Sequence, residues 1–324
     1  MSKREQDKDT LGNRMKEYEF ISTSRQLMPN CPVYARIDGR AFHTFCRGLE
    51  KPFSQVFIEV MQETCKSLVE HTHACLGYVQ SDEISLGWED ITHAPFDGRV
   101  QKLESNLASL ASAKFVWQIL RGMTASCGYF PDDVATLVAR VDNHPPSFDC
   151  RVFNVPTMSE LANCFLWREN DAIKNSILGI AYNMFTQKEV FKKNTDELVH
   201  MMRMKGYCFY EDTEPAFMRG TFYHREDYLK ELSDDEVARI PESQRGKLIS
   251  KGKNCGELES CVLAKTRLKS DRFYCLRSHI VPMNLPYRLA ETQALVEALF
   301  KRWDDAIYSK KSNPTFDLSK REKI

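Results

Sequence analysis

Two acidic segments of this chain carry the residue types that phosphate chemistry requires. Asp38 ends a strand-like run, residues 33–37, and is followed by a glycine, whereas Asp82 and Glu83 lie between two further strand-like runs. Two carboxylates that lie close together repel each other unless a cation is bound between them. Mg²⁺ binds one or two carboxylates together with water and substrate phosphates, and a glycine lets the backbone approach a phosphate because it has no Cβ. The combination indicates a metal and phosphate site.

Each segment alone also has an ordinary structural explanation. Asp38-Gly39 is a common turn sequence, and Asp82-Glu83 is typical of the tip of a hairpin. The joint pattern favours the metal site, because an acidic pair beside a glycine turn comes at matching strand ends.

The predicted elements bring the two segments to one edge of a sheet. Strands are expected at residues 33–37, 76–79 and 84–88, and a helix with apolar residues at i, i+3, i+4 and i+7 is expected at 53–73. This strand, crossing helix and hairpin place Asp38 beside Asp82. Because side chains alternate along a strand, Glu83 is expected to point the opposite way from Asp82.

The rest of the chain completes an α+β fold. A helix over 99–122 and a strand over 150–155 extend the first unit to a palm-like β-α-β-β-α-β antiparallel sheet flanked by helices. We expect a catalytic domain at residues 1–155, and a helical C-terminal region at 156–324 that continues the same globule. Further elements are predicted at 11–23 (a helix packed on the domain), 158–185 and 290–308 (helices), 278–283 (a strand) and Ser233 (the cap of a helix).

Composition limits the classes of partner and compartment. Lys plus Arg and Asp plus Glu number 45 each, so the net charge is zero, unlike that of a protein that coats nucleic acid nonspecifically. A local basic face balanced by acidic residues elsewhere is compatible with tRNA. The eleven cysteines lack metal-ligand spacing, which is typical of reduced thiols. With a charged N-terminus and no long apolar run, we expect a cytoplasmic protein with no membrane partner.

Six segments together resemble one known family, the tRNA-His guanylyltransferase superfamily of reverse (3′-to-5′) polymerases, which add nucleotides to the 5′ end of tRNA. The similarity in order and spacing runs from about residue 14 to 224. The matching segments are Ala35-Arg36-Ile37-Asp38-Gly39-Arg40-Ala41-Phe42-His43, Glu50-Lys51-Pro52, Gln80-Ser81-Asp82-Glu83-Ile84-Ser85, Phe148-Asp149-Cys150-Arg151-Val152, Trp167-Arg168-Glu169-Asn170-Asp171 and Arg219-Gly220-Thr221-Phe222.

The resemblance implies a nucleotidyltransferase with a palm-type site. A tRNA with a 5′-monophosphate would be activated with ATP, and the 3′-hydroxyl of an incoming nucleoside triphosphate, such as GTP, would then attack the activated end. Two Mg²⁺ ions would stabilise the attacking and leaving oxygens. Because relatives assemble as tetramers, a homotetramer is also expected.

The same resemblance implies roles for individual residues. Asp38 and Asp82 would be catalytic metal ligands, with the Gly39 carbonyl as a third ligand, and Glu83 would tune the metals from outside the ligand set. The implied nucleotide-binding residues are Asp38, Gly39, Arg40, Ala41, Phe42, His43, Lys51, Ser81, Asp82, Arg99 and Lys102.

Several of these residues have a structural alternative. A histidine at position 43, between a strand and a helix, is often a satisfied structural group, and Lys51 before a proline is compatible with an exposed turn. Arg99 and Lys102 stand one helical turn apart, as a solvated surface pair also does. Trp167 taken alone is expected in the core.

Two segments depart from the family pattern and leave alternatives open. Ile173-Lys174-Asn175-Ser176 replaces a His-Ile-Asn-Asn motif, and Cys208 stands where relatives have an asparagine. The first change resembles the Thg-like branch, which predicts template-dependent repair of tRNA 5′ ends rather than obligatory G addition. A palm-fold nucleotidyl cyclase and a catalytically idle RNA-binding module are the alternatives. The two aspartates speak against the idle module, because a pure binder gains nothing from repelling carboxylates.

Overall fold

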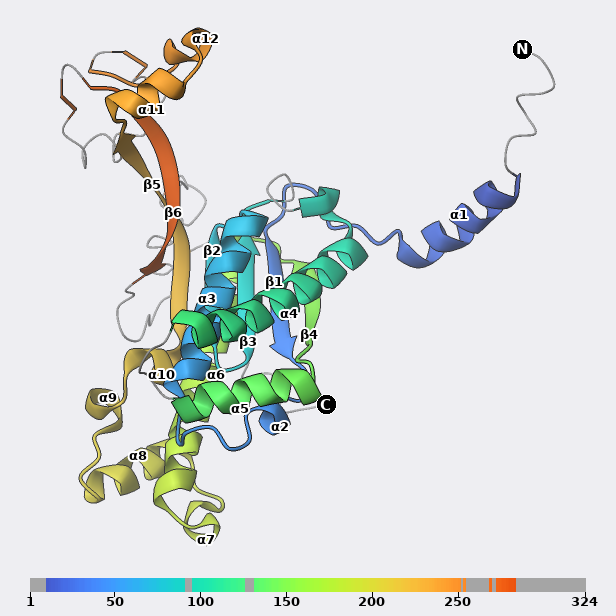
Figure 1. Ribbon diagram of the computed structural model, residues 1–324. Coiled ribbons are helices and arrows are strands. Elements are labelled where there is room, and N and C mark those ends of the chain that lie inside the picture. The colour runs from blue at the N-terminus through green and yellow to red at the C-terminus, as the bar shows by residue number, and fades with distance from the viewer. Residues whose placement is uncertain are drawn as a thin grey trace, which may run out of the picture.

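The computed structural model describes residues 10–90, 95–125, 131–251, 253–254, 268–269 and 272–283. A six-stranded sheet in the order β4-β1-β3-β2-β5-β6, with every neighbouring pair antiparallel, forms its centre (Figure 1). The strands are β1 (Val33–Gly39), β2 (Leu76–Gln80), β3 (Glu83–Trp88), β4 (Phe148–Asn154), β5 (Thr221–Glu231) and β6 (Tyr274–Met283).

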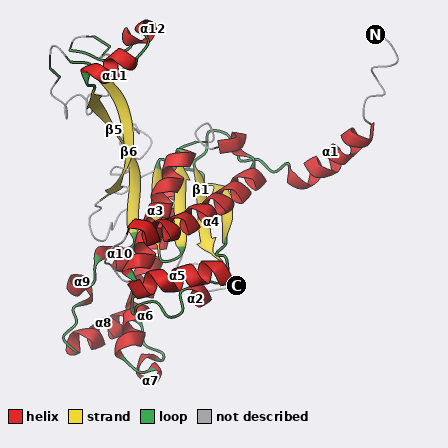
Figure 2. Cartoon of the chain, in the orientation of Figure 1, coloured by secondary structure: helices red, strands yellow, loops and turns green. Residues whose placement is uncertain are grey.

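Helices flank this sheet, as Figure 2 shows. The long helices are α3 (Gln55–Thr72), α4 (Val100–Ala125), α5 (Pro131–Asn143) and α6 (Met158–Met184). The remaining helices are α1 (Thr10–Thr23), α2 (Phe42–Phe45), η1 (Pro95–Gly98), α7 (Gln187–Val190), α8 (Thr195–Met204), α9 (Phe209–Asp212), α10 (Pro215–Arg219), α11 (Asp234–Arg239) and α12 (Glu242–Arg245). The predicted palm-like sheet and its long helices are confirmed.

Helix starts follow the caps that the sequence encodes. The Ser54 hydroxyl accepts a hydrogen bond from the Phe57 N–H, so α3 begins at Gln55. Ser233 caps α11 and forms the predicted capping box with Glu236, whose carboxylate accepts a hydrogen bond from the Ser233 N–H. These two caps determine the residue at which α3 and α11 begin.

The two faces of the sheet have different cores because side chains alternate along β1. Val33, Ala35 and Ile37 pack in the cluster formed with α3 and α4. Tyr34 packs on the opposite face with α6 residues such as Phe165, at a ring-centroid distance of 5.3 Å. By the same alternation Asp38 belongs to the α6 face of the sheet.

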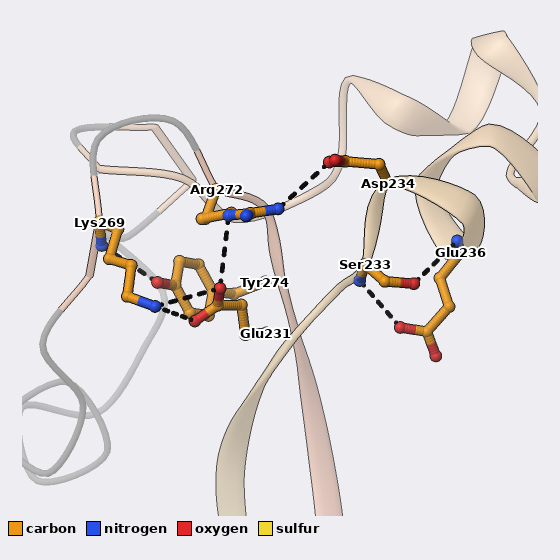
Figure 3. Close-up of polar contacts among 7 residues, drawn as sticks. All are labelled: Glu231, Ser233, Asp234, Glu236, Lys269, Arg272 and Tyr274. Atoms are coloured by element: carbon orange, nitrogen blue, oxygen red, sulfur yellow. Dashed lines mark hydrogen bonds and ion pairs between the residues drawn. The ribbon is translucent and has the colours of Figure 1, made fainter.

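β5 and β6 form an arm that extends beyond the palm. The start of β5, residues 221–224, pairs with β2, whereas residues 222–231 pair with β6. Figure 1 shows this ribbon carrying α11 and α12 at its far end. At the tip Glu231 contacts both Lys269 and Arg272, and Arg272 also reaches Asp234 (Figure 3).

Two expectations about the ends of the chain are changed. α1 has no buried residue and projects from the body (Figure 1), so the prediction that it packs on the domain is wrong. The region after residue 156 contributes β5, which the sequence did not indicate, and β6, which starts earlier than the predicted strand. The helix expected at 290–308 lies outside the described residues. Among the helices that the structure describes, none has the length and apolarity to cross a membrane.

Candidate active site

The end of β1 and the β2–β3 turn meet at one edge of the sheet. The backbone N–H of Gly39 donates to the carbonyl oxygen of Asp82 at 3.0 Å, and Asp38 is the register partner of Glu83. Ser81 closes the turn with a left-handed φ of 47°. The structure therefore brings Asp38 and Asp82 to a common edge.

The carboxylates at this edge repel one another. Burial raises the pKa of Asp82, and the charge on Asp38 raises it further. Burial also raises the pKa of Asp38, and the next contributor is Asp149, its register partner on β4. The sequence places Asp149 only in a matching segment, because its pairing with Asp38 depends on the β1–β4 register. A cation at this edge would relieve the repulsion.

A metal here would draw on few protein ligands. Within the described ranges of the chain, His, Cys, Asp and Glu side chains do not gather in groups of three or more that fit a metal ion. Mg²⁺ binds through one or two carboxylates and takes its other ligands from water and phosphates. Asp38, Asp82 and the Gly39 carbonyl are therefore a donor set of the right chemistry.

The segment after Gly39 is anchored by an aromatic cluster. Ala41 takes a left-handed φ of 58° and begins α2. Phe42 is only 3% exposed and its ring packs within about 6 Å of four other rings, those of Phe45, Phe57, Phe115 and Phe148. The Phe42 side chain therefore faces the core and positions the turn.

Polar residues around this anchor face solvent. Burial raises the pKa of the Cys46 thiol to about 12, and the charge on Asp82 adds to the shift while Lys51 opposes it. Seven residues of the predicted nucleotide set are exposed: Arg40, Ala41, His43, Lys51 and Ser81, together with Arg99 and Lys102.

Arg99 and Lys102 lie at the other end of the sheet. Residue 99 bridges to Gln26, ahead of the start of β1. The Ser112 hydroxyl, further along α4, accepts from the Phe148 N–H, beside the Asp38 edge. Ten residues of helix span about 15 Å, so the structure does not bring Lys102 to that edge.

Glu83 is held by arginines on the α6 face. Arg168 donates to both of its carboxylate oxygens, at 2.6 and 2.8 Å, and Arg36 approaches to 3.9 Å. Burial raises the pKa of Glu83, while the bonds from Arg168 oppose that shift. Since its carboxylate is engaged, Glu83 orients its neighbours and is not free to bind a metal directly.

Trp167 departs from the expectation of a core residue. It is 53% exposed, and the guanidinium carbons of Arg168 and Arg36 lie 4.6 and 5.6 Å from its ring centroid. The expectation fails because α6 covers the sheet with residues such as Leu161 and Phe165, which leaves residue 167 on the outer side.

Comparison with known proteins identifies the family. A family model described as tRNAHis guanylyltransferase matches residues 12–156. A solved bacterial tRNA(His) guanylyltransferase (Thg1)-like protein in complex with ATP is 33% identical, with a TM-score of 0.57 over 66% of this chain and 88% of that one. The chain belongs to the tRNAHis guanylyltransferase family. This is a family of nucleotidyltransferases.

Two further members show how far the similarity extends. A bacterial protein of the same description, solved in complex with GTP, is 26% identical over 89% of this chain and 99% of its own, with a TM-score of 0.56. A probable tRNA(His) guanylyltransferase of Drosophila melanogaster is 29% identical over 62% of this chain and 65% of its own. The predicted family is confirmed.

Other family segments build the support of the site. Arg219 forms a buried ion pair with Glu169, and its carbonyl oxygen accepts a hydrogen bond from the Tyr78 hydroxyl at 2.8 Å. Gly220 follows with φ 76° and ψ −171°, a conformation that essentially only glycine adopts. These contacts join α6 and β2 to α10, immediately before β5 begins.

Proposed function

We propose that the protein is a 3′-5′ nucleotidyltransferase that adds nucleotides to the 5′ end of tRNA after activation of that end with ATP. The observation that carries the proposal is the meeting of Asp38 and Asp82 at one sheet edge, in a chain of this family. Bacterial members of the family solved with ATP and with GTP support nucleotide substrates.

Two Mg²⁺ ions are the metals of this proposal. Asp38, Asp82 and the Gly39 carbonyl would hold them, because carboxylate and carbonyl oxygens are the ligands that Mg²⁺ takes. When bound, the ions would stabilise charge on the attacking and leaving oxygens. The raised pKa values of both aspartates fit this donor set, since a bound cation favours their ionised forms.

The chain itself would bind and orient the triphosphate. Arg40, His43 and Ser81 are exposed around the turn, and Lys51 adds a cation for a phosphate. Catalysis of phosphoryl transfer depends mainly on such positioning and charge stabilisation. Arg99 and Lys102, at the far end of the sheet, would contact phosphates of the tRNA. A homotetramer in the cytoplasm is part of the proposal.

Template-dependent repair is the form of the reaction that we favour. Residues 173–176 lack the histidine of the family motif that accompanies dedication to tRNA-His. They lie on α6, and Lys174 and Asn175 are exposed. A surface without that histidine fits a protein that accepts several tRNAs.

The proposal is tested by incubating the protein with Mg²⁺, ATP, all four nucleoside triphosphates and a tRNA that lacks its first nucleotide. We expect a 5′-extended product, and none from the Asp82→Ala variant when that variant remains folded. A cyclic nucleotide formed without RNA would instead establish a cyclase, and RNA binding without turnover would establish an idle module. A tRNA without a nucleotide opposite the added position distinguishes the two reactions. Template-dependent repair should then stop, whereas obligatory G addition should continue.

A further inference from the structure

Trp167 is an exposed aromatic residue for which the proposed reaction gives no role. It belongs to the family segment at residues 167–171 and remains 53% exposed on α6. A large side chain exposed to this extent needs an explanation when it lies beside a site of phosphate chemistry. The positive charges of both arginines that contact its ring, Arg36 and Arg168, also lower the pKa of Asp38.

The Trp167 ring has a fixed support. Arg168 and Arg36 both contact the Glu83 carboxylate, at 2.6 and 3.9 Å, and the guanidinium carbons of both lie within 6 Å of the indole centroid. Arg168 is also tied to Asp171 at 3.2 Å. Cations held over an indole ring are attracted to it, so the ring is pre-positioned before any ligand arrives.

A cationic residue extends this surface toward the carboxylates. Arg151 is the register partner of Arg36, and Asp149 is the partner of Asp38, one step further along the same face. The Arg151 side chain is 53% exposed. Arg151 and Asp149 are two residues apart on β4, which is about 7 Å. The indole, the Arg151 guanidinium and the acidic edge therefore lie within reach of one or two nucleotides.

This surface is on the opposite face of the sheet from the turn that would bind the triphosphate. Phe42 and Phe45 of α2 belong to the core cluster of α3 and α4, whereas Arg168 and Trp167 belong to α6. Asp38 lies at the edge between the two regions. A reaction that joins two substrates needs each of them on its own side of the reacting centre.

We propose that Trp167 is a stacking platform for the base of the 5′-terminal nucleotide of the RNA substrate, with Arg151 contacting the adjoining phosphate. Proteins bind single nucleotides of RNA ends by combining aromatic rings for the bases with cations for the backbone. The inference rests on the proposed function, and it adds the side from which the RNA end enters.

The competing explanation is that Trp167 only covers the ion pairs of Glu83. The test measures the Kd of the full chain for a tRNA lacking its first nucleotide, without nucleoside triphosphates, and separately the Kd for ATP. Trp167→Leu is expected to raise the tRNA Kd roughly 10- to 100-fold and to leave the ATP Kd within about twofold. Trp167→Phe should restore most of the tRNA affinity, because it keeps an aromatic face.

Trp117→Leu is the matched control. Trp117 is 60% exposed on α4, on the other face of the sheet, so this variant should bind tRNA as the unchanged protein does. A tRNA whose 5′-terminal nucleotide is abasic gives the complementary test. It should bind the unchanged protein as weakly as ordinary tRNA binds Trp167→Leu, and the two changes together should cost no more than either alone.

Three outcomes would overturn the inference. Equal loss of ATP affinity in Trp167→Leu would assign the indole to the free nucleotide. Lower thermal stability of Trp167→Leu with unchanged tRNA affinity would assign it to covering the ion pairs, as would failure of the abasic change to weaken binding. If the unchanged protein extends tRNA 5′ ends while Trp167→Leu binds tRNA normally, the proposed function stands and only this inference fails. If the unchanged protein does not bind tRNA at all, both proposals are refuted.

Discussion

The Gly39 backbone N–H donates to the Asp82 carbonyl oxygen at 3.0 Å, which ties the end of β1 to the β2–β3 turn. This bond leaves the Gly39 carbonyl and both carboxylates at the same edge. It also makes the spacing of the two acidic groups a property of the backbone, because neither carboxylate is needed to form it.

Replacing either carboxylate should abolish activity while preserving the fold. Asp38→Asn and Asp82→Asn remove a charge that the metals require, and we expect nucleotide addition to fall at least about 100-fold, since a metal supplies several kcal/mol of transition-state stabilisation. Both variants relieve repulsion, so their thermal stability should be equal to or above that of the unchanged protein. Asp196→Asn, on the exposed start of α8, should keep full activity. Retained activity in both site variants would refute the assignment.

A methyl group at Gly39 should disturb the turn. A Cβ there would lie 2.5 Å from the ring of Phe42, which its aromatic neighbours hold in place. We expect Gly39→Ala to lose about 1–3 kcal/mol in urea unfolding and to lower activity. Gly122→Ala is the control, because the space around Gly122 in α4 is open, and it should gain about 0.5–1 kcal/mol. Unchanged stability in Gly39→Ala would contradict this packing.

Replacing only one partner of the buried pair of Glu83 and Arg168 should strongly reduce the free energy of unfolding. Both side chains are less than a tenth exposed, so Arg168→Met leaves a buried carboxylate and is expected to cost about 3–5 kcal/mol of unfolding free energy. Adding Glu83→Gln should recover part of that loss. The exposed pair of Lys193 and Glu197 is the control, and Lys193→Met should cost less than about 0.5 kcal/mol. An additive double variant would disprove the coupling.

Gly220 should tolerate no side chain. Its φ of 76° with ψ −171° is strained for other residues, and a Cβ would lie 2.5 Å from the Val79 carbonyl oxygen. Gly48 also has a positive φ, of 93°, but nothing lies within 4 Å of its Cβ position. Thermal unfolding should therefore show a larger loss for Gly220→Ala than for Gly48→Ala, whose cost is about 1–2 kcal/mol of backbone strain. Equal losses would show that β5 shifts without penalty.

Acid should loosen the tip of the arm within a defined range of pH. The hydrogen bond from Lys230 lowers the pKa of Glu236 to about 2 from its ordinary 4.5, and the Ser233 N–H, drawn in Figure 3, adds to the shift. Because the folded pKa is depressed, this stabilisation is complete above pH 4.5 and is lost as the pH falls to about 2. An NMR titration should show the pKa of Glu236 rising toward 4.5 in Lys230→Met; no change would contradict the pairing.

The local sequence was enough to predict the acidic edge. A strand that ends in Asp38-Gly39 and a hairpin that turns at Asp82 are specified by short-range alternation and turn chemistry, which neighbouring residues determine. The helix caps at Ser54 and Ser233 are equally local. The family resemblance extended this prediction to the activity, because it depends on the order of several short segments.

Only the tertiary structure decided which distant groups join that edge. Asp149 reaches Asp38 through the register of β1 and β4, and Lys102 is separated from it by the length of α4. Trp167 was expected in the core, but the buried face of α6 carries Phe165, Arg168 and Glu169, so the indole lies on the exposed side of the helix. Hydrophobic periodicity indicates which face of a helix is buried, but it does not identify the element that this face packs against. Strand register and helix position depend on contacts between residues far apart in the chain, and the fold as a whole selects them.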